Sequence, residues 1–151
     1  MIERALPSDS DEIFTLHIEN INKSFAGHYP QEVIDVLIEG RTADAFKPII
    51  QNEAFYCLKI NNVIQGFVHF NDNELLALYL KFSQIGKGYG KKLFNFAVSK
   101  IETRPIKIVS TLQAVPFYKK MGCQLQELSF ITKNNRDIYV QIMSYNETPQ
   151  A

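Results

Sequence analysis

Three of the seven glycines in this 151-residue chain, Gly86, Gly88 and Gly90, fall within five residues of one another. The segment before them, 74–81 (ELLALYLK), has the composition of a β-strand, and the segment after them has the apolar spacing of a helix that ends near Ile101. Glycine adopts positive φ freely and lets a ligand approach the main chain. The first N–H groups of a helix have no intrahelical acceptor, so they can bind an anion. The pattern therefore predicts a phosphate or pyrophosphate cradle.

The loop is locally basic, because Lys87, Lys91 and Lys92 lie in it or directly after it. Two known nucleotide motifs do not fit it. A P-loop, G-x-x-x-x-G-K-[ST], requires a hydroxyl residue after Gly-Lys, whereas Gly90 is followed by two lysines. A dinucleotide fingerprint, G-x-G-x-x-G, has a different spacing and is expected in an early βαβ unit. A plain tight turn remains the alternative to a phosphate site.

The rest of the chain reads as alternating helical and extended segments, and its length predicts one domain over residues 1–151. Asn61-Asn62, between two β-rich runs, is typical of a tight hairpin with positive φ. The order predicts an α+β domain with a single mixed, mostly antiparallel sheet of about seven strands flanked by helices. Expected strands are 2–5, 54–60, 63–70, 74–81, 106–109, 125–132 and 137–143, and expected helices are 13–26, 30–39, 43–51, 90–101 and 115–121.

Composition excludes several classes of protein. Sixteen basic residues balance sixteen acidic ones, which argues against a globally basic nucleic-acid binder. Two cysteines, Cys57 and Cys123, are too few for a disulfide framework, and no His, Asp or Glu grouping has metal-ligand spacing. No apolar run approaches the roughly 20 residues that span a bilayer, and no leader pattern is present at the start. We expect a cytoplasmic protein with free thiols and with no nucleic-acid or membrane partner.

Two motifs in this order resemble a known family. Residues 78–80 (LYL), 85–90 (IGKGYG) and 93–94 (LF) are similar to motif A, [QR]-x-x-G-x-[GA], of the GNAT superfamily of acyl-CoA-dependent N-acetyltransferases. Residues 114–122 (AVPFYKKMG) resemble its motif B, A-x-x-F-Y-x-x-x-G-F. The element order also matches the family, so the resemblance covers nearly the whole chain and implies a GNAT-like three-layer domain.

The resemblance implies acetyl-CoA as cosubstrate and no metal. In the family the strand before the loop pairs its backbone with the pantetheine arm, and the loop amides hold the pyrophosphate. The cofactor-binding residues implied here are Leu78, Tyr79, Leu80, Ile85, Gly86, Lys87, Gly88, Tyr89, Gly90 and Lys91.

The sequence departs from the family at several positions. Ile85 replaces the Gln or Arg that opens motif A, Phe82 replaces a frequent Pro, Thr111 a frequent Asn, and Cys123 the final Phe of motif B. Backbone binding of a pyrophosphate survives these changes, whereas a side-chain contact from position 85 does not.

Acetyl transfer to an amine raises two proton problems. An alkyl ammonium of pKa near 10.4 must lose a proton at a cost of about 4.6 kcal/mol at pH 7, and the departing thiolate benefits from a donor. Tyr118, the Tyr of the matched F-Y pair, is the expected acid, because the family places this Tyr near the CoA sulfur. Glu74 is the expected base, at the offset that the histone-acetyltransferase branch uses; His69 and a water chain remain competitors.

The acceptor is not readable from the sequence, and a small-molecule amine and a protein amine both remain open. His28 and Tyr29 lie in a short connection, expected to be exposed, where the family commonly builds its acceptor pocket. We expect an N-acetyltransferase that transfers acetyl to a primary amine by direct attack; the alternatives are a GNAT-fold module that binds an acyl-CoA or a protein without turnover, and a general phosphate-binding α+β domain. The C-terminal strands suggest a possible homodimer through edge pairing.

Overall fold

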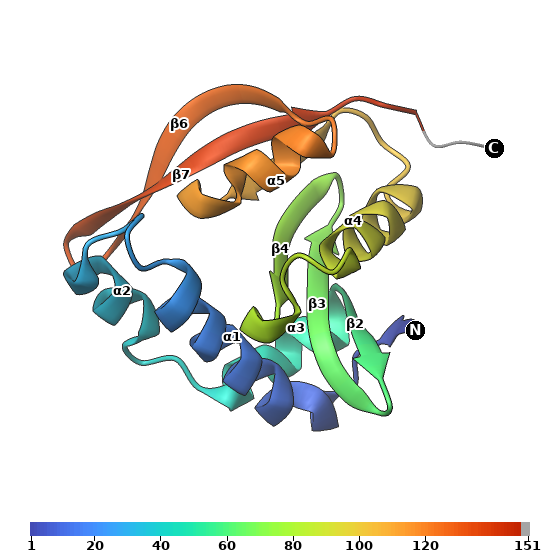
Figure 1. Cartoon of the computed structure of the whole chain (residues 1–151), viewed down its shortest axis with the longest axis horizontal. Helices are drawn as coiled ribbons and strands as arrows, with labels where there is room; N and C mark the ends of the chain where they lie inside the picture. The colour runs from blue at the N-terminus through green and yellow to red at the C-terminus, as the bar shows by residue number, and fades with distance from the viewer. Residues whose placement is uncertain (149–151) are drawn as a thin grey trace.

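The computed structural model describes residues 1–148 and is built on one seven-stranded sheet (Figure 1). Its order is β1-β2-β3-β4-β5-β7-β6, and every neighbouring pair is antiparallel except β4 with β5. The strands are β1 (Ile2–Arg4), β2 (Ala54–Ile60), β3 (Val63–Asn71), β4 (Glu74–Leu80), β5 (Ile106–Ser110), β6 (Gln124–Lys133) and β7 (Arg136–Tyr145). The mixed, mostly antiparallel α+β sheet expected from the sequence is therefore confirmed.

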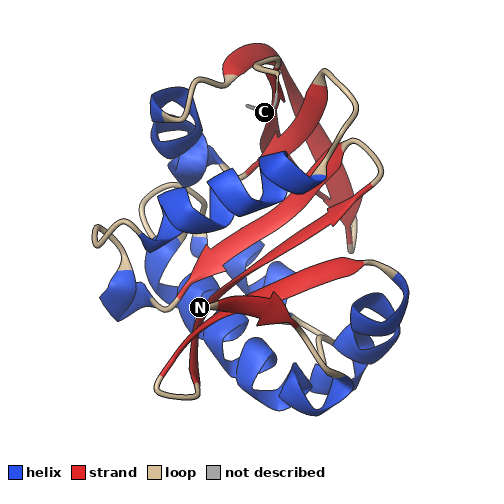
Figure 2. Cartoon of the chain, turned by 90° about the vertical axis from the view of Figure 1, so that its right-hand side faces the viewer, coloured by secondary structure: helices blue, strands red, loops and turns tan. Residues whose placement is uncertain are grey.

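Helices pack on both faces of this sheet (Figure 2). One face carries α4, whose Leu93 and Phe94 are fully buried against strand residues such as Val68 and Ile108. The other face carries the first three helices, whose Ile13 and Ile50 pack on Phe55 and neighbouring strand residues. The helices are α1 (Ser10–Ser24), α2 (Gln31–Ile38), α3 (Phe46–Asn52), α4 (Tyr89–Lys100) and α5 (Val115–Lys120).

Two tight hairpins follow from asparagine pairs. Asn61 and Asn62 have φ of 51° and 67°, and Asn134 and Asn135 have φ of 50° and 60°. Asparagine tolerates this left-handed region better than most residues, so a two-residue turn with the twist of the flanking strands forms at low cost. The first hairpin joins β2 to β3 as expected, and the second joins β6 to β7.

The parallel pair β4–β5 is the weak point of the sheet. Only Glu74 with Lys107 and Leu75 with Ile108 are in register, and beyond these pairs the two strands separate. A bulge accompanies the separation, because His69 of β3 pairs with Ala77 and Phe70 pairs with Leu75, which leaves Leu76 without a partner in β3. A bulge bends its strand and increases its local twist, so β4 turns away from β5 at this point.

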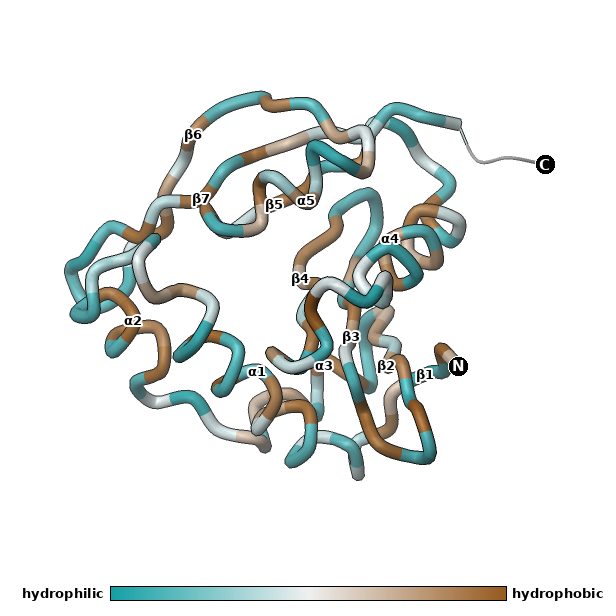
Figure 3. Tube along the Cα trace, in the orientation of Figure 1, coloured by the Kyte–Doolittle hydropathy of each residue, from teal (hydrophilic) through white to brown (hydrophobic). Residues whose placement is uncertain are grey.

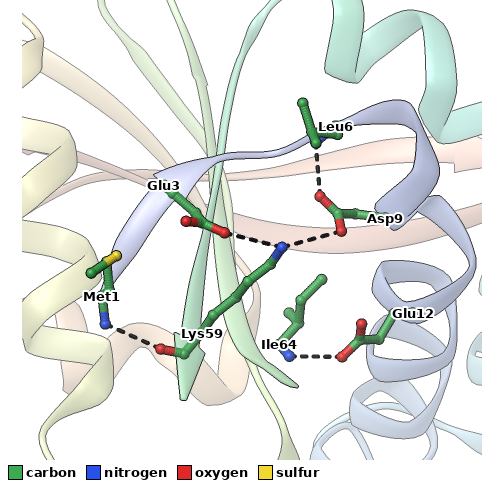
Figure 4. A network of polar contacts seen from close by, with 7 residues as sticks. All are labelled: Met1, Glu3, Leu6, Asp9, Glu12, Lys59 and Ile64. Atoms are coloured by element: carbon green, nitrogen blue, oxygen red, sulfur yellow. Dashed lines mark hydrogen bonds and ion pairs between the residues drawn. The ribbon is translucent and has the colours of Figure 1, made fainter. Parts of the chain in front are cut away.

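A polar network fixes the start of α1 to the sheet (Figure 4). Lys59 Nζ, on β2, contacts Glu3 Oε1 at 3.1 Å and Asp9 Oδ1 at 3.4 Å. Glu12 Oε2, in the first turn of the helix, accepts a hydrogen bond of 2.7 Å from Ile64 N–H. These contacts set where α1 begins, and hence where its later residues meet β4. No helix within residues 1–148 has the length and hydropathy needed to cross a membrane.

Candidate active site

A cavity of about 190 Å³ lies where β4 and β5 separate. Its walls come from five parts of the chain: the end of α1, the second half of β4, the glycine loop with the start of α4, the segment after β5, and α5. It is mostly apolar, and it is lined by Asn20, Ser24, Leu78, Tyr79, Leu80, Ile85, Gly90, Thr111, Gln113, Ala114, Phe117 and Tyr118.

The β4 wall of the cavity carries main-chain groups that the sheet does not use. Lys81 N–H bonds Gln65 O of β3 at 2.7 Å, so in this register residues 77 and 79 also point their polar groups at β3. Leu78 and Leu80 direct their N–H and C=O groups to the opposite side, toward the space that opens where β4 and β5 separate. Asn20 Nδ2 donates to Leu80 O at 2.7 Å. The N–H groups of Leu78 and Leu80 and the carbonyl of Leu78 therefore remain free to face the cavity. This edge can pair with an extended ligand as another strand would.

The glycine loop presents a second set of free amides. Gly86 and Gly88 have φ of 88° and 86°, and a Cβ added at either would meet nothing within 4 Å. Gly88 is the N-cap of α4, and the first intrahelical bond runs from Lys92 N–H to Gly88 O at 3.2 Å. The N–H groups from Gly88 to Lys91 therefore lack intrahelical acceptors. The loop has the geometry of an anion-binding helix start.

The third glycine has a different purpose. Gly90 lies inside α4 with an ordinary helical φ, and a Cβ there would come within 3.0 Å of the Phe117 ring. The absent side chain lets the start of α4 approach α5 closely. Only two of the three clustered glycines are therefore needed for backbone conformation.

A wider hollow of about 410 Å³ continues from the cavity along the glycine loop. Leu80, Ile85, Gly90 and Phe117 line both, so the two are contiguous. Two cationic side chains, Lys91 and Lys120, line the hollow but not the cavity. The other residues that line only the hollow are Gly86, Gly88 and Met121. Of the cofactor residues expected from the sequence, Lys87 and Tyr89 line neither space. The cavity is thus an apolar slot bordered by the free main-chain groups of β4, and the hollow that continues it is basic because of Lys91 and Lys120.

Tyr118 reaches the slot from α5. Its side chain is buried, packs against Phe94 and Phe117, and makes no hydrogen bond to the described residues. Burial raises the pKa of its phenol above the ordinary value of 10.0, with Tyr79 and Cys123 adding to the shift. The hydroxyl therefore stays protonated at neutral pH and is a donor.

Neither expected base lines the cavity. Glu74 lies at the joined end of β4 and β5, where its Oε1 is 3.9 Å from Lys107 Nζ. It precedes Leu78 by four residues, or about 13 Å along a strand. His69 stacks on Phe55 and shares a 3.0 Å contact with Glu53 Oε1. Among the described lining residues there is no carboxylate and no imidazole.

The connection between α1 and α2 is only partly exposed. His28 is exposed, as expected, but Tyr29 is buried, and the expectation of an exposed connection is wrong for this residue. Tyr29 OH donates to Tyr139 O at 2.6 Å and accepts from Leu112 N–H at 3.1 Å. Neither residue lines the cavity. Tyr29 instead holds the segment that leads into α5 in place, because its hydroxyl bonds both the carbonyl of Tyr139 and the N–H of Leu112.

Sequence reasoning missed the polar residues on the inner face of α1. His17, Asn20 and Ser24 follow one another at spacings of three and four, so they share a face with buried Ile13 and Ile21. Ser24 Oγ, with Gln113 Oε1 across the cavity, is shielded from solvent and has no hydrogen-bond partner among the described residues. The sequence did hold a signal for these residues, because they recur on a face of the helix that is otherwise apolar.

His17, on the same face of α1, packs against Tyr79, and the centroids of the two rings are 4.5 Å apart. Burial, with a contribution from Arg41, lowers the pKa of His17 to about 3, so its imidazole is neutral at physiological pH. The ring packs edge-on against Tyr79, Phe46 and Phe67. This environment makes it a packed core histidine and a poor proton acceptor.

The fold and the cleft define the class of protein. The sequence model for the acetyltransferase (GNAT) domain matches residues 25–138, more than half of the chain. The chain belongs to the GNAT acetyltransferase family. No curated protein sequence gives a significant match.

Solved structures of this family share the fold. A GCN5-related N-acetyltransferase from Rhodopseudomonas palustris matches with a TM-score of 0.91 at 15% identity, over 97% of this chain and 95% of that one. The PaiA N-acetyltransferase from Thermoplasma acidophilum, solved in complex with coenzyme A, gives 0.80 at 21% identity, over 97% and 98%. The yncA protein from Salmonella typhimurium, solved with its cofactor acetyl-CoA, gives 0.74 at 14% identity, over 100% and 95%. The GNAT fold is thus found along nearly the full length of the chain.

Proposed function

We propose that this protein is an N-acetyltransferase that moves an acetyl group from acetyl-CoA to a primary amine, by direct attack of the amine on the thioester. The observation that carries the proposal is the free edge of β4, which runs at one end into the glycine loop and its unpaired amides. An extended amide-containing arm with a pyrophosphate at its end matches this sequence of surfaces. The acceptor is a small-molecule or protein amine.

The cleft offers partners for each part of acetyl-CoA. The pantetheine amides pair with the main chain of Leu78 and Leu80. Ser24 Oγ, which can donate to a pantetheine carbonyl, and Gln113 Oε1, which can accept from a pantetheine N–H, have no hydrogen-bond partner among residues 1–148. The pyrophosphate accepts from the loop amides, with Lys91 and Lys120 beside it. Each charge-assisted hydrogen bond contributes about 1.5–3 kcal/mol. The thioester then lies in the slot, beside Tyr118.

Tyr118 assists the departure of the sulfur. The amine nitrogen attacks the carbonyl carbon, the C–S bond breaks, and the electron pair goes to the sulfur. A thiol pKa is near 8.5 and the phenol pKa is above 10, so complete proton transfer from Tyr118 to the thiolate is uphill. The phenol therefore stabilises the developing thiolate by donating a hydrogen bond, and the thiolate takes its proton from solvent.

The proton released by the amine goes to water. The lining of the cavity holds no carboxylate or imidazole among the described residues, and Glu74 and His69 are engaged elsewhere. The amine then reacts in its neutral form, so the dependence of kcat/KM on pH should follow the pKa of the acceptor itself. Glu74→Gln should leave this profile unchanged. A profile that changes with Glu74→Gln would restore Glu74 as the base.

The test of the proposal is release of free CoA thiol from acetyl-CoA in the presence of a panel of primary amines. We expect turnover with at least one amine class, and Tyr118→Phe should lower kcat by about a hundredfold or more while CoA binding is kept, because it removes one hydrogen-bond donor to the developing anion. Unchanged turnover in Tyr118→Phe would remove the assigned role.

The absence of a base from the described lining residues also favours a second candidate, an acyl-CoA-binding module without turnover. Tight acetyl-CoA binding with no thiol release across a broad panel would select this candidate. Protection of the protein by ATP but not by CoA would instead select a general phosphate-binding domain.

A further inference from the structure

Two cationic side chains meet at the C-terminal end of α2. Arg41 Nε donates to Leu37 O, and Lys133 Nζ, at the end of β6, donates to the same carbonyl at 3.4 Å and to Glu39 O at 3.0 Å. In Figure 3 the hydrophilic end of the β6–β7 hairpin, which carries Lys133, lies beside α2. Because the guanidinium and the ammonium bond one oxygen, a single small ligand can contact both.

The arginine keeps most of its hydrogen-bonding capacity. A guanidinium has five N–H donors. Within residues 1–148, Arg41 donates only from Nε and makes no ion pair. The neighbouring carboxylate of Glu39 is bound by the hairpin turn instead, where Asn134 Nδ2 donates to its Oε2 at 2.9 Å. Capping the last carbonyls of α2 therefore accounts for one donor of Arg41, and the terminal fork of its guanidinium is left over.

Tyr79 connects this cationic pair to the cavity. Its side chain lines the cavity and also packs against the apolar cluster that contains Leu37. Burial lowers the pKa of His17 to about 3 and raises the pKa of Tyr79 to about 12, and the positive charge of Arg41 lowers both values. Because the two rings pack on each other, the guanidinium is close to the cavity wall that Tyr79 forms.

The charge around the acceptor space has one sign, although the chain as a whole has sixteen basic and sixteen acidic residues. The described residues that line the cavity are uncharged, and Lys91 and Lys120 line the hollow that continues it. Arg41 and Lys133 add positive charge on the α2 side. A polycationic acceptor is repelled by these groups, whereas an anionic group on the acceptor is attracted.

We propose that Arg41 and Lys133 bind a carboxylate of the acceptor, and that the acceptor is therefore an amino acid. The planar fork of an arginine matches the two oxygens of a carboxylate, and Lys133 supplies its one remaining N–H donor. The acceptor then extends along Tyr79, and its amine faces the thioester beside Tyr118. This inference rests on the acetyl transfer proposed above and names the class of its acceptor.

The test compares matched acceptors by release of CoA thiol from acetyl-CoA. The panel holds the common α-amino acids and a series of unbranched ω-amino acids. Each is paired with the amine that lacks the carboxylate and with the diamine that carries an ammonium in its place. We expect kcat/KM for the best amino acid to exceed that of both partners by about tenfold or more, because only the amino acid forms the charge-assisted hydrogen bonds. Equal values for the three, or a preference for the diamine, would overturn the proposal.

Variants of Arg41 identify the group that selects the carboxylate. Arg41→Gln keeps an N–H that can donate to Leu37 O but removes the charge. It should raise KM for the amino acid about 10- to 150-fold and leave KM for the monoamine unchanged, whereas Arg41→Lys should retain most of the preference. Arg136→Gln is the matched control on the β6–β7 hairpin, because Arg136 is already paired with Glu32 at 2.9 Å, and it should change neither KM. An equal rise of both KM values in Arg41→Gln would refute the assigned role.

A binding measurement separates this inference from the enzymatic proposal. N-acetyl amino acids carry the carboxylate but no basic amine, so they can be titrated calorimetrically into the complex of the full chain with CoA. Binding that Arg41→Gln weakens about tenfold or more supports the carboxylate site even if no amine releases thiol, in which case only the transfer is refuted. No binding at millimolar concentration overturns the site, even if amines without a carboxylate are acetylated.

Discussion

Replacement of Gly88 by alanine separates the effect of backbone strain from the effect on ligand binding. Gly88 has a φ of 86° and open space around its α-carbon, so an added methyl group meets nothing within 4 Å. The cost of Gly88→Ala to folding is then the left-handed conformation alone, about 1–2 kcal/mol. For a chain of this length each kcal/mol corresponds to about 2–4 °C, so Tm should fall by about 2–8 °C.

Gly40 offers a matched control. It also has a positive φ, 74°, and nothing within 4 Å of a built Cβ, but it follows α2, away from the glycine loop. Gly40→Ala should lower Tm by the same amount as Gly88→Ala. Only Gly88→Ala should weaken CoA, because relief of the strain rotates the amides at the start of α4. The loss of one charge-assisted hydrogen bond, about 1.5–3 kcal/mol, predicts a Kd about 10- to 150-fold higher.

Differential scanning calorimetry and isothermal titration with CoA give the two quantities on the same samples. If Gly88→Ala lowers Tm as Gly40→Ala does but binds CoA with the wild-type Kd, the loop amides do not hold the pyrophosphate and the reasoning is refuted. Equal loss of CoA affinity in both variants would refute it as well, since it would reflect general destabilisation.

Other outcomes follow from the inner face of α1. Asn20→Ala removes the donor to Leu80 O and should lower the free energy of unfolding by about 1–3 kcal/mol in urea titrations, whereas exposed Asn22→Ala should change it by less than about 0.5 kcal/mol. His17 should make stability depend on pH. Its pKa is about 3 in the folded protein and 6.5 in the unfolded chain. Between pH 3 and pH 6.5 the unfolded chain therefore binds one more proton at this residue than the folded protein does. Stability is full above pH 6.5 and falls by about 1.4 kcal/mol per unit below it, or about 2 kcal/mol by pH 5. His17→Phe should remove this part of the slope; an identical pH dependence in the variant would show that His17 is not its source.

Local signals in the sequence predicted much of the fold. The Asn61-Asn62 pair and the change from helical to alternating apolar spacing depend on neighbouring residues, and the predictions of this hairpin and of the strands were confirmed. The glycine loop was placed correctly between a strand and a helix for the same reason. Gly90 was grouped with Gly86 and Gly88 because spacing cannot distinguish a glycine required for positive φ from one required by a ring on another helix.

Long-range contacts could not be predicted from the sequence. Asn20 meets Leu80 across 60 residues, and Tyr29 meets Tyr139 across 110. Tyr29 lies in a turn, where a tyrosine is usually exposed, and its burial follows from its stacking on Phe25 within a core cluster and from its two main-chain partners. Glu74 has the sequence offset of a family base, yet that offset carries no information on where β4 leaves β5.

The short joint between β4 and β5 has a consequence for how the protein unfolds. Within residues 1–148, two residue pairs form the whole β4–β5 ladder, so hydrogen bonding joins the first four strands to the last three through a narrow seam, and the core under α4 is what spans both halves. Segments held by few shared bonds open as separate cooperative units, well before the whole molecule does. Coenzyme A bound as proposed above would contact both halves and hold them together. Slow amide exchange in β5 to β7 should therefore depend on its concentration more steeply than exchange in β2 and β3, because the ligand suppresses opening of the seam before it affects the interior of either half.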